Sequence, residues 1–394
     1  VLARKHNTFG TVCMRGGKLD IAIKHFLKAI EAAGDRPFSN AHHNLANTYC
    51  SLKMHAEAKE HYLKAIEVSP YNSPERPADV NPHFNAEGAY LESFTNLAVL
   101  YMLEGRLDEA QEYCHKAISL SPQGSEAHIN LGNLLRQLQR RSEAIEHVWT
   151  QVENSAFADG QTFERPEMLD AKAFVLPADH MEGILHVVCV KWGTKYGADY
   201  VNKLYRGVTK HLSLPHDFTC FTEDPTGLDE GILTHPLAEN WNNWWGKATL
   251  FAPHHLTGRL LYIDLDSVIT GSLDDLGRYD GAFALMSTRD IYCEKAKDGY
   301  NSSIIAWHSS FGSSIYTSLK RYYQYVLKYI CRFDFWLEMT VANSDYVQEA
   351  FPNQFLDYCS YCQESVPEGC RIVAFPRDPK PHEAKAGWIE ELWQ

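Results

Sequence analysis

Residues 260–266 read Leu-Leu-Tyr-Ile-Asp-Leu-Asp, so a short apolar run ends in two aspartates with one residue between them. A bounded apolar run of this length predicts a buried strand. Residues two apart on an extended chain point to the same side, so Asp264 and Asp266 can face one ion while Leu265 faces the core. Carboxylate oxygens suit Mn2+ or Mg2+. The stretch therefore predicts a cation site that could hold a nucleotide diphosphate; a pair of solvated loop acids is the alternative.

The segments around this stretch alternate between strand and helix patterns. Apolar and β-branched runs predict strands at residues 186–190, 218–222, 232–236, 259–264, 282–286 and 302–307. Helical spacing of apolar side chains covers residues 198–211, and an amphipathic helix is predicted at residues 244–254. This order predicts an α/β sheet with helices on both faces, in which ligands bind beyond the carboxyl ends of the strands.

Small residues recur at a fixed interval in the first 150 residues. The series is Ala22, Ala58, Ala110 and Ala144, followed seven residues later by Ala29, Ala65 and Ala117. The pattern resembles the tetratricopeptide repeat, a helix–turn–helix unit of about 34 residues, and predicts a helical solenoid. Residues 71–88, rich in Pro and Asn, are predicted to form a loop between the second and third units. The resemblance implies a groove for a protein or peptide partner; bracing or dimerising the neighbouring domain is the alternative.

The length and net charge of the chain limit its domain number and its classes of binding partner. The chain has 394 residues, of which 45% are hydrophobic, enough for two domains. The predicted division is a repeat domain at 1–154, a linker at 155–182 and a sheet domain at 183–394. A net charge of −13 argues against nucleic acid as the main partner, because phosphate binding needs a basic surface. No apolar run approaches the roughly 20 residues that span a bilayer. The chain begins with Val1, so the native amino terminus is expected to be missing.

The ten cysteines are scattered, which favours free thiols, a reducing compartment and a cytoplasmic location. One cluster stands out: Cys359, Cys362 and Cys370 at the carboxyl-terminal end. Together with His382 they could form a zinc site, although no second Cys-x-x-Cys pair completes the set. Three unpaired thiols in a tyrosine-rich segment are the alternative.

Five segments of the second half carry a family resemblance. They are residues 187–196 (VVCVKWGTKY), 245–247 (WGK), 264–266 (DLD), 300–303 (YNSS) and 375–383 (FPRDPKPHE). In these segments the chain resembles the A-type nucleotide-diphospho-sugar glycosyltransferases, nearest in pattern to the glycogenin and galactosyltransferase-like family 8. The resemblance implies that Asp264 and Asp266 coordinate Mn2+ or Mg2+, which grips the diphosphate of a UDP-sugar donor.

The same resemblance implies roles for further residues. Lys247 and Lys380 would contact the diphosphate, and Lys191 and Tyr196 match the loop that holds the nucleoside. Asn301 matches an asparagine that contacts sugar hydroxyls, and Asp334 is the candidate acid near the acceptor. The family places a histidine shortly before the late Lys-Pro as a third metal ligand. Here Ala374 and Pro376 occupy those positions, so His382 is the substitute candidate.

Each of these side chains also has a purely structural explanation. Lys247 and Lys380 can be solvated charges, Tyr196 can pack on a helix, and Asn301 can cap a turn. Asp334 can pair with Arg332. Trp241, Trp244 and Trp245 can stack on sugars, but three tryptophans in five residues are more often a core or an interdomain seam.

Three functions remain open at this point. The first is transfer of a hexose from a nucleotide diphosphate sugar to an acceptor hydroxyl. The second is a non-catalytic repeat scaffold with a degenerate transferase domain, favoured by the missing histidine. The third, a nucleotidyltransferase, usually needs a glycine-rich loop after the first strand, and Gly193 and Gly197 are too sparse for one.

Overall fold

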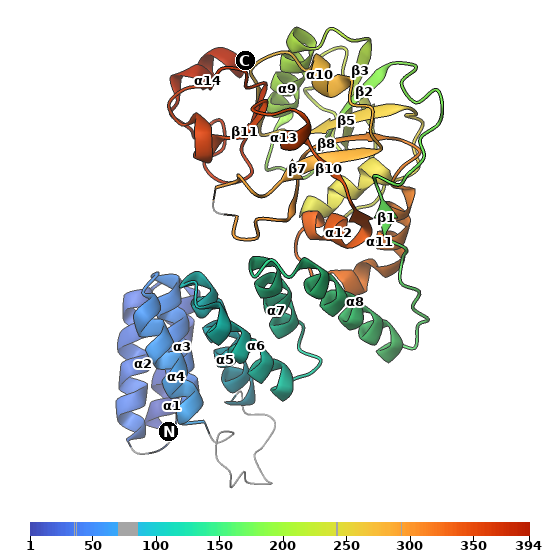
Figure 1. The fold of residues 1–394 in the computed structure, drawn as a ribbon. Coiled ribbons are helices and arrows are strands. Elements are labelled where there is room, and N and C mark those ends of the chain that lie inside the picture. The colour runs from blue at the N-terminus through green and yellow to red at the C-terminus, as the bar shows by residue number, and fades with distance from the viewer. Residues whose placement is uncertain (35, 37, 70–85, 242, 293) are drawn as a thin grey trace. The chain divides into compact units, whose positions relative to one another are not determined.

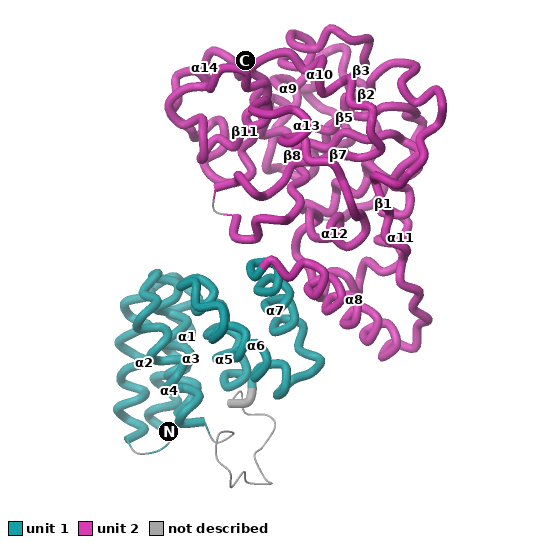
Figure 2. Tube along the Cα trace, in the orientation of Figure 1, with its two compact units in different colours: residues 1–138 teal, residues 139–394 magenta. Residues whose placement is uncertain are grey.

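The computed structural model describes residues 1–394 except residues 35, 37, 70–85, 242 and 293. The chain divides into two compact units, residues 1–138 and residues 139–394 (Figures 1 and 2). None of the helices in the described ranges combines enough length with enough apolar character to traverse a lipid bilayer.

The first unit is built from helices that pack in consecutive pairs. They are α1 (Leu2–Arg15), α2 (Leu19–Ala33), α3 (Ser39–Ser51), α4 (His55–Glu67), α5 (Ala86–Leu103), α6 (Leu107–Leu120) and α7 (Ser125–Gln137). The recurring small residues let the helices of a pair approach closely: a Cβ on Gly10 would lie 2.6 Å from the ring of the fully buried Phe26. This is the helical solenoid that the spacing predicts. Most of the predicted loop at 71–88 lies outside the described residues, and residues 86–88 belong to α5.

Helix α8 (Arg141–Ala158) lies in the second unit, although its sequence continues the repeat spacing. Its apolar face packs against α11 (Ser313–Val326) and α12 (Phe333–Thr340). Trp149 meets Trp336 edge to face with ring centroids 5.6 Å apart, and the Ser155 hydroxyl lies 2.6 Å from that of Tyr329. Further along, β1 (Leu169–Asp170) pairs in parallel with β9 (Val341–Ala342). The segment predicted as a linker at 155–182 is therefore part of the second unit and makes specific contacts within it.

A seven-stranded mixed sheet organises the second unit, in the order β10-β7-β8-β5-β2-β3-β4. Its strands are β2 (Leu185–Lys191), β3 (His216–Thr222), β4 (Leu233–His235), β5 (Arg259–Ile263), β7 (Phe283–Ser287), β8 (Tyr300–His308) and β10 (Asp345–Tyr346). β8 runs antiparallel to both of its neighbours, and the other pairings are parallel. The predicted strands match these within a few residues, and α9 (Ala198–His211) has the predicted bounds.

The predicted amphipathic helix at 244–254 has a different form. The structure has a 3₁₀ helix, η2 (Asn243–Phe251), in its place. It ends before Pro253, which has no N–H to donate to a continuing helix. A 3₁₀ helix has three residues per turn, so side chains three apart share one face.

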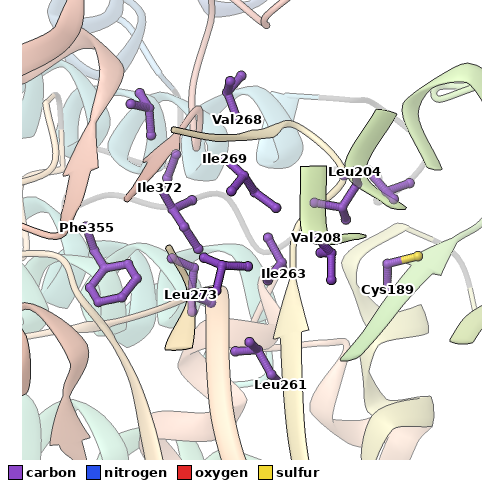
Figure 3. Close-up of a cluster of buried hydrophobic side chains, with 14 of the residues drawn as sticks. Cys189, Leu204, Val208, Leu261, Ile263, Val268, Ile269, Leu273, Phe355 and Ile372 are labelled. Atoms are coloured by element: carbon purple, nitrogen blue, oxygen red, sulfur yellow. The ribbon is translucent and has the colours of Figure 1, made fainter. Parts of the chain in front are cut away.

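The core of the second unit lies on one face of this sheet, where apolar side chains of β2, β5 and α9 converge (Figure 3). The opposite face is covered by η2, α11 and α12, where Phe251 contacts Phe283, Trp307 and Phe333 at ring distances of 5.4–6.4 Å. Helices therefore cover both faces, as predicted. The remaining elements are β6 (Ser267–Ile269), α10 (Asp274–Gly277), α13 (Val347–Ala350), β11 (Phe355–Asp357), η3 (Tyr358–Cys362), β12 (Ile372–Ala374) and α14 (Gly387–Leu392).

Candidate functional site

The carboxyl end of β5 places Asp264 at the edge of the large sheet. Because β8 runs antiparallel to β5, the beginning of β8 reaches the same edge, with Ile263 opposite Ile304. The Asp264 N–H donates to the Ser303 carbonyl at 2.8 Å. Sheet topology thus brings residues 301–303 beside the aspartate pair. Leu265 is almost fully buried in the core cluster, as the alternation predicts.

A second, smaller sheet brings the late Lys-Pro segment to the same place. β6 starts directly after Asp266 and pairs antiparallel with β12, so that Ser267 lies opposite Ala374. The chain leaving β12 therefore passes Asp266. Lys380, distant in sequence, lies with its ammonium 2.8 Å from the Asp266 carboxylate and donates to the Phe375 carbonyl at 2.7 Å.

Each aspartate has its own lysine partner. The Lys247 ammonium lies 2.8 Å from Oδ1 of Asp264, and it also donates to the carbonyl and hydroxyl of Ser302 at 3.2 and 3.1 Å. Both lysines are buried, with side-chain exposures of 9%. Buried ammonium groups need compensating charge, so these contacts exclude the interpretation of Lys247 and Lys380 as solvated surface lysines.

Two tyrosines also donate to the pair. The Tyr196 hydroxyl donates to Oδ2 of Asp266 at 2.7 Å, and the Tyr262 hydroxyl donates to Oδ1 of Asp264. Burial, and then the charge of the neighbouring aspartates, raise the pKa of both phenols above the usual value. Both hydroxyls therefore keep their protons and act as fixed hydrogen-bond donors that orient the carboxylates.

These groups line a cavity of about 360 Å³. Five acidic and five basic side chains share its wall, so the charges of the protein balance within it. The lining residues are Val190, Trp192, Lys195, Tyr196, Asn243, Trp244, Lys247, Tyr262, Asp264, Leu265, Asp266, Glu294, Asn301, Ser302, Ser303, Arg332, Asp334, Pro376, Arg377, Asp378 and Lys380. A polar pocket of this size suits a small charged ligand rather than an apolar one.

Asn301 and Asp334 lie on the wall of this cavity. The side-chain oxygen of Asn301 accepts from the Ser303 N–H at 3.0 Å, which leaves its amide nitrogen for another partner. Asp334 accepts from the backbone N–H of Ser302 at 3.0 Å and from the Ser302 hydroxyl. The charge of Asp334 also acts on Arg332, as the structural alternative expects, but the hydrogen bonds to Asp334 in the described part of the chain come from Ser302.

Arg332 instead pairs with Glu294, as does Arg377, at nitrogen–oxygen distances of 2.8 and 2.7 Å. Glu294 is buried; burial alone would raise its pKa, but the hydrogen bond to Arg332 and the charges of both guanidinium groups outweigh it and lower the pKa. This three-residue cluster holds the segment before Lys380 against the cavity wall.

Two predicted site residues lie outside the cavity lining. The Lys191 ammonium is buried and donates to the Asp224 carbonyl at 3.1 Å. His382 is more than half exposed, and its Nδ1 is hydrogen bonded to the Tyr200 hydroxyl. Its ring therefore has a partner other than the aspartate pair.

The described residues contain no cluster of three or more His, Cys, Asp or Glu side chains arranged for a metal ion. The alternative zinc site at Cys359, Cys362, Cys370 and His382 is therefore wrong. The Cys359 thiol contacts the Asp378 carbonyl at 3.6 Å, whereas Cys370 is buried beside Ile372. The Cys362 and Cys370 thiols contact each other, but no third ligand completes a set with them in the described part of the chain.

Sequence analysis missed two features of this site. Tyr262 was assigned only to the strand, yet it lies two residues before Asp264 and shares its face, so the alternation already indicated the contact. Glu294 sits in an irregular segment without a recognisable pattern. Its partners Arg332 and Arg377 are remote in sequence, so no local signal identifies the cluster.

The chain's oxygen donors fit a hard divalent cation. Mg2+ and related ions are commonly held by one or two carboxylates together with phosphate oxygens of the substrate, rather than by a complete protein cage. Asp264 and Asp266 supply two carboxylates in one polar cavity, and the ammonium groups of Lys247 and Lys380 now balance their charge. An incoming cation would replace these ammonium groups at the carboxylates and free them for an anion.

Comparison with protein families supports the repeat assignment. Residues 1–70 and 91–123 match tetratricopeptide repeat family models, so the first unit carries tetratricopeptide repeats and the prediction is confirmed. The second unit is a mixed α/β domain with the polar cavity described above.

Among curated proteins, the chain is similar to "Protein O-mannosyl-transferase Tmtc3" of Drosophila melanogaster, with 32% identity over 139 residues. It is also similar to "Protein O-mannosyl-transferase TMTC3" of Homo sapiens, with 31% identity over 147 residues. These matches cover 35% and 36% of this chain but only 14% and 15% of the relatives.

Two solved structures are similar to part of this chain. YrrB, described as a tetratricopeptide repeat protein with an unusual peptide-binding site, is 20% identical; the match covers 36% of this chain and 63% of YrrB, with a TM-score of 0.29. BtubC from P. vanneervenii is 18% identical; the match covers 45% of this chain and 70% of BtubC, with a TM-score of 0.35.

Proposed function

We propose that this protein is a metal-dependent glycosyltransferase that moves a hexose from a nucleotide diphosphate sugar, most simply a UDP-sugar, to an acceptor hydroxyl. The observation that carries the proposal is the convergence of Asp264, Asp266, Lys247 and Lys380 in one polar cavity. This cavity lies at the carboxyl edge of the sheet, where ligands bind in open α/β folds. The mixed sheet is also the architecture that the resemblance to A-type glycosyltransferases implies.

Breaking the bond between a sugar and a diphosphate builds negative charge on the leaving group, and fixed cations stabilise it. Asp264 and Asp266 would hold Mn2+ or Mg2+, which supplies Lewis-acid charge when bound. Lys247 and Lys380 are proposed to turn from the carboxylates to the diphosphate. Tyr196 keeps Asp266 oriented and, with Lys191, is proposed to lie near the nucleoside. His382 is left out of this proposed metal site, because it does not line the cavity that holds the aspartate pair.

Asn301 and Asp334 are proposed to define the sugar side of the cavity. The amide nitrogen of Asn301 is a donor suited to a sugar hydroxyl. The Asp334 carboxylate is held by two donors of Ser302 and can orient an acceptor hydroxyl or accept its proton.

The repeat array is proposed to recruit a protein acceptor or partner. A row of half-buried amides supports this: Asn44 donates to Asn7 at 3.1 Å, and Asn96 donates to Asn47 at 3.1 Å. These contacts link α1, α3 and α5, the first helices of successive units. Amides in a row can hydrogen bond to the backbone of an extended peptide. The printed names of the curated relatives describe transfer of mannose to proteins, which is compatible with this proposal, although those matches span a small part of the relatives.

The donor proposal is tested by thermal unfolding with UDP and UDP-hexoses in the presence of Mn2+. A ligand at a hundredfold excess over its dissociation constant stabilises the fold by about 2.7 kcal/mol, which corresponds to a rise of about 5–10 °C in a unit of this size. Removal of Mn2+ with a chelator is expected to abolish most of the shift, and uridine, which lacks the diphosphate, is the matched control. If UDP-sugars with Mn2+ leave the melting temperature unchanged, the proposal fails.

One observation favours the non-catalytic scaffold. Each aspartate is paired with a lysine, so the site is electrically balanced without a bound metal ion or substrate. The two functions differ in turnover. A transferase releases UDP from a UDP-hexose, a scaffold releases nothing, and a nucleotidyltransferase releases pyrophosphate.

The recruitment proposal predicts a selective effect of the double variant Asn44→Ala/Asn96→Ala. The ratio of transfer to a protein acceptor over hydrolysis of the UDP-hexose is expected to fall about tenfold, because an extended peptide would lose two amide hydrogen bonds of about 0.5–1.5 kcal/mol each. Both rates are measured with the same UDP-hexose labelled in the sugar. An unchanged ratio would remove the amide row from the recruitment proposal.

A further inference from the structure

The structure separates the three tryptophans that follow each other closely before Lys247. Trp241 stacks on Tyr323 with centroids 4.4 Å apart and planes at 12°. Trp245 is 4% exposed and contacts Tyr323 and Phe333. Trp244 is 49% exposed and lines the cavity. Two of these rings therefore stabilise the fold, whereas the third presents an aromatic surface to the candidate site.

The geometry of η2 explains this separation. Residues 245–251 of η2 are all buried, so Trp244 is exposed because it lies near the start of the helix. Residues three apart lie on one face of a 3₁₀ helix, so Trp245, Ala248 and Phe251 share one face. Trp244 and Lys247 share another face for the same reason. At a rise of about 2 Å per residue, their Cα atoms are about 6 Å apart along the axis. Lys247 contacts Asp264 at 2.8 Å, and Trp244 lines the same cavity as the aspartate pair.

The backbone before Trp244 has an unusual conformation. Asn243 has a φ of 58°, in the left-handed region that non-glycine residues seldom adopt. Such conformations persist where the surrounding structure enforces them, and they gather at ligand sites. Here Asn243 lines the cavity and directly precedes the exposed indole.

We propose that Trp244 is a stacking platform for the apolar face of a saccharide next to the diphosphate-binding groups. The CH groups of a hexose form a flat apolar face, and the exposed indole of Trp244, beside the charged groups of the cavity, offers a matching surface. The saccharide is either the hexose of the donor or a saccharide acceptor. This inference rests on the proposed function and adds to it a residue that recognises the sugar.

Whether Trp244 stacks on the hexose of the donor is tested by titration calorimetry with UDP and with UDP-glucose or UDP-galactose, in the presence of Mn2+. Trp244→Ala is expected to weaken UDP-hexose binding about tenfold relative to UDP binding, since UDP lacks the stacked ring. Trp244→Phe keeps an aromatic face and is expected to preserve most of the preference. Trp244→Leu keeps apolar volume without a ring and is expected to behave like Trp244→Ala.

Whether Trp244 instead stacks on a saccharide acceptor is tested with the same variants and with maltose and lactose as acceptors. A platform for the acceptor predicts that the KM for the accepted disaccharide rises about tenfold in Trp244→Ala and Trp244→Leu but little in Trp244→Phe. Because Trp244 is half exposed, all three variants are expected to fold, which circular dichroism verifies.

The outcomes separate this inference from the proposed function. If the wild-type protein binds no UDP in the presence of Mn2+, the proposed function itself fails, and this inference fails with it. If UDP binds but both the UDP-hexose preference and the disaccharide KM stay at wild-type values in Trp244→Ala, only the stacking platform is overturned. Weaker binding of UDP itself in Trp244→Ala would place the indole on the nucleobase and also overturn it.

Discussion

Asp266→Asn is expected to lower kcat/KM for the best UDP-hexose by at least about 10³-fold. The substitution keeps the shape of the side chain but removes its negative charge, and with it a carboxylate ligand of the proposed cation. Without the cation, the transition state loses several kcal/mol of charge stabilisation at the leaving diphosphate. Because each 1.36 kcal/mol changes the rate tenfold, this loss corresponds to a decrease of about 10³-fold. UDP release is measured with Mn2+ in excess, and binding of Mn2+ in the presence of UDP is followed separately by electron paramagnetic resonance.

The matched control is Asp280→Asn, the same chemical change at an exposed position outside the cavity lining, which is expected to retain wild-type activity. An Asp266→Asn enzyme that keeps its Mn2+ affinity and loses less than about tenfold in kcat/KM would exclude Asp266 as a metal ligand. Lys380 has a second partner in the Phe375 carbonyl, so the variant is not left with an ammonium lacking any acceptor.

Trp336→Ala is expected to lower the free energy of unfolding of the second unit by about 3–5 kcal/mol. The ring is fully buried, its Nε1–H donates to the Ile315 carbonyl at 3.0 Å, and it contacts Trp149 of α8. The variant opens a large cavity and removes the side-chain hydrogen bond to the Ile315 carbonyl, and both effects destabilise. Amide hydrogen exchange of α11 and α12 measures the loss, and exchange in α3 of the first unit serves as the internal reference.

Two further variants separate the contributions of ring volume, hydrogen bonding and packing against α8. Trp336→Phe restores most of the volume but lacks the N–H donor, so a smaller loss is expected. Trp149→Ala, on α8, is expected to accelerate exchange in α11 and α12, because its ring packs on Trp336. Faster exchange only in the helices of the first unit would mean that α8 functions as part of the repeat array, as the sequence spacing alone suggests.

Local spacing predicted the elements of this protein well. The recurring alanines identified the repeats because close helix packing needs small side chains at fixed intervals. The bounds of α9 and the strands around Asp264 followed from periodicity for a similar reason. The type of helix at η2 did not follow, because a run with Trp245, Leu250 and Phe251 has an apolar face at either three or 3.6 residues per turn.

The amino-acid sequence alone determined the tetratricopeptide repeats and the strand that ends in Asp264 and Asp266, because each depends on side chains close together along the chain. The tertiary structure decided the partners of these residues. Pairing of β6 with β12 brings Lys380 to Asp266, antiparallel β8 brings Ser302 to Lys247, and α8 joins the second unit. The physical reason is that remote segments meet through strand register and the burial of apolar faces, which local spacing does not specify.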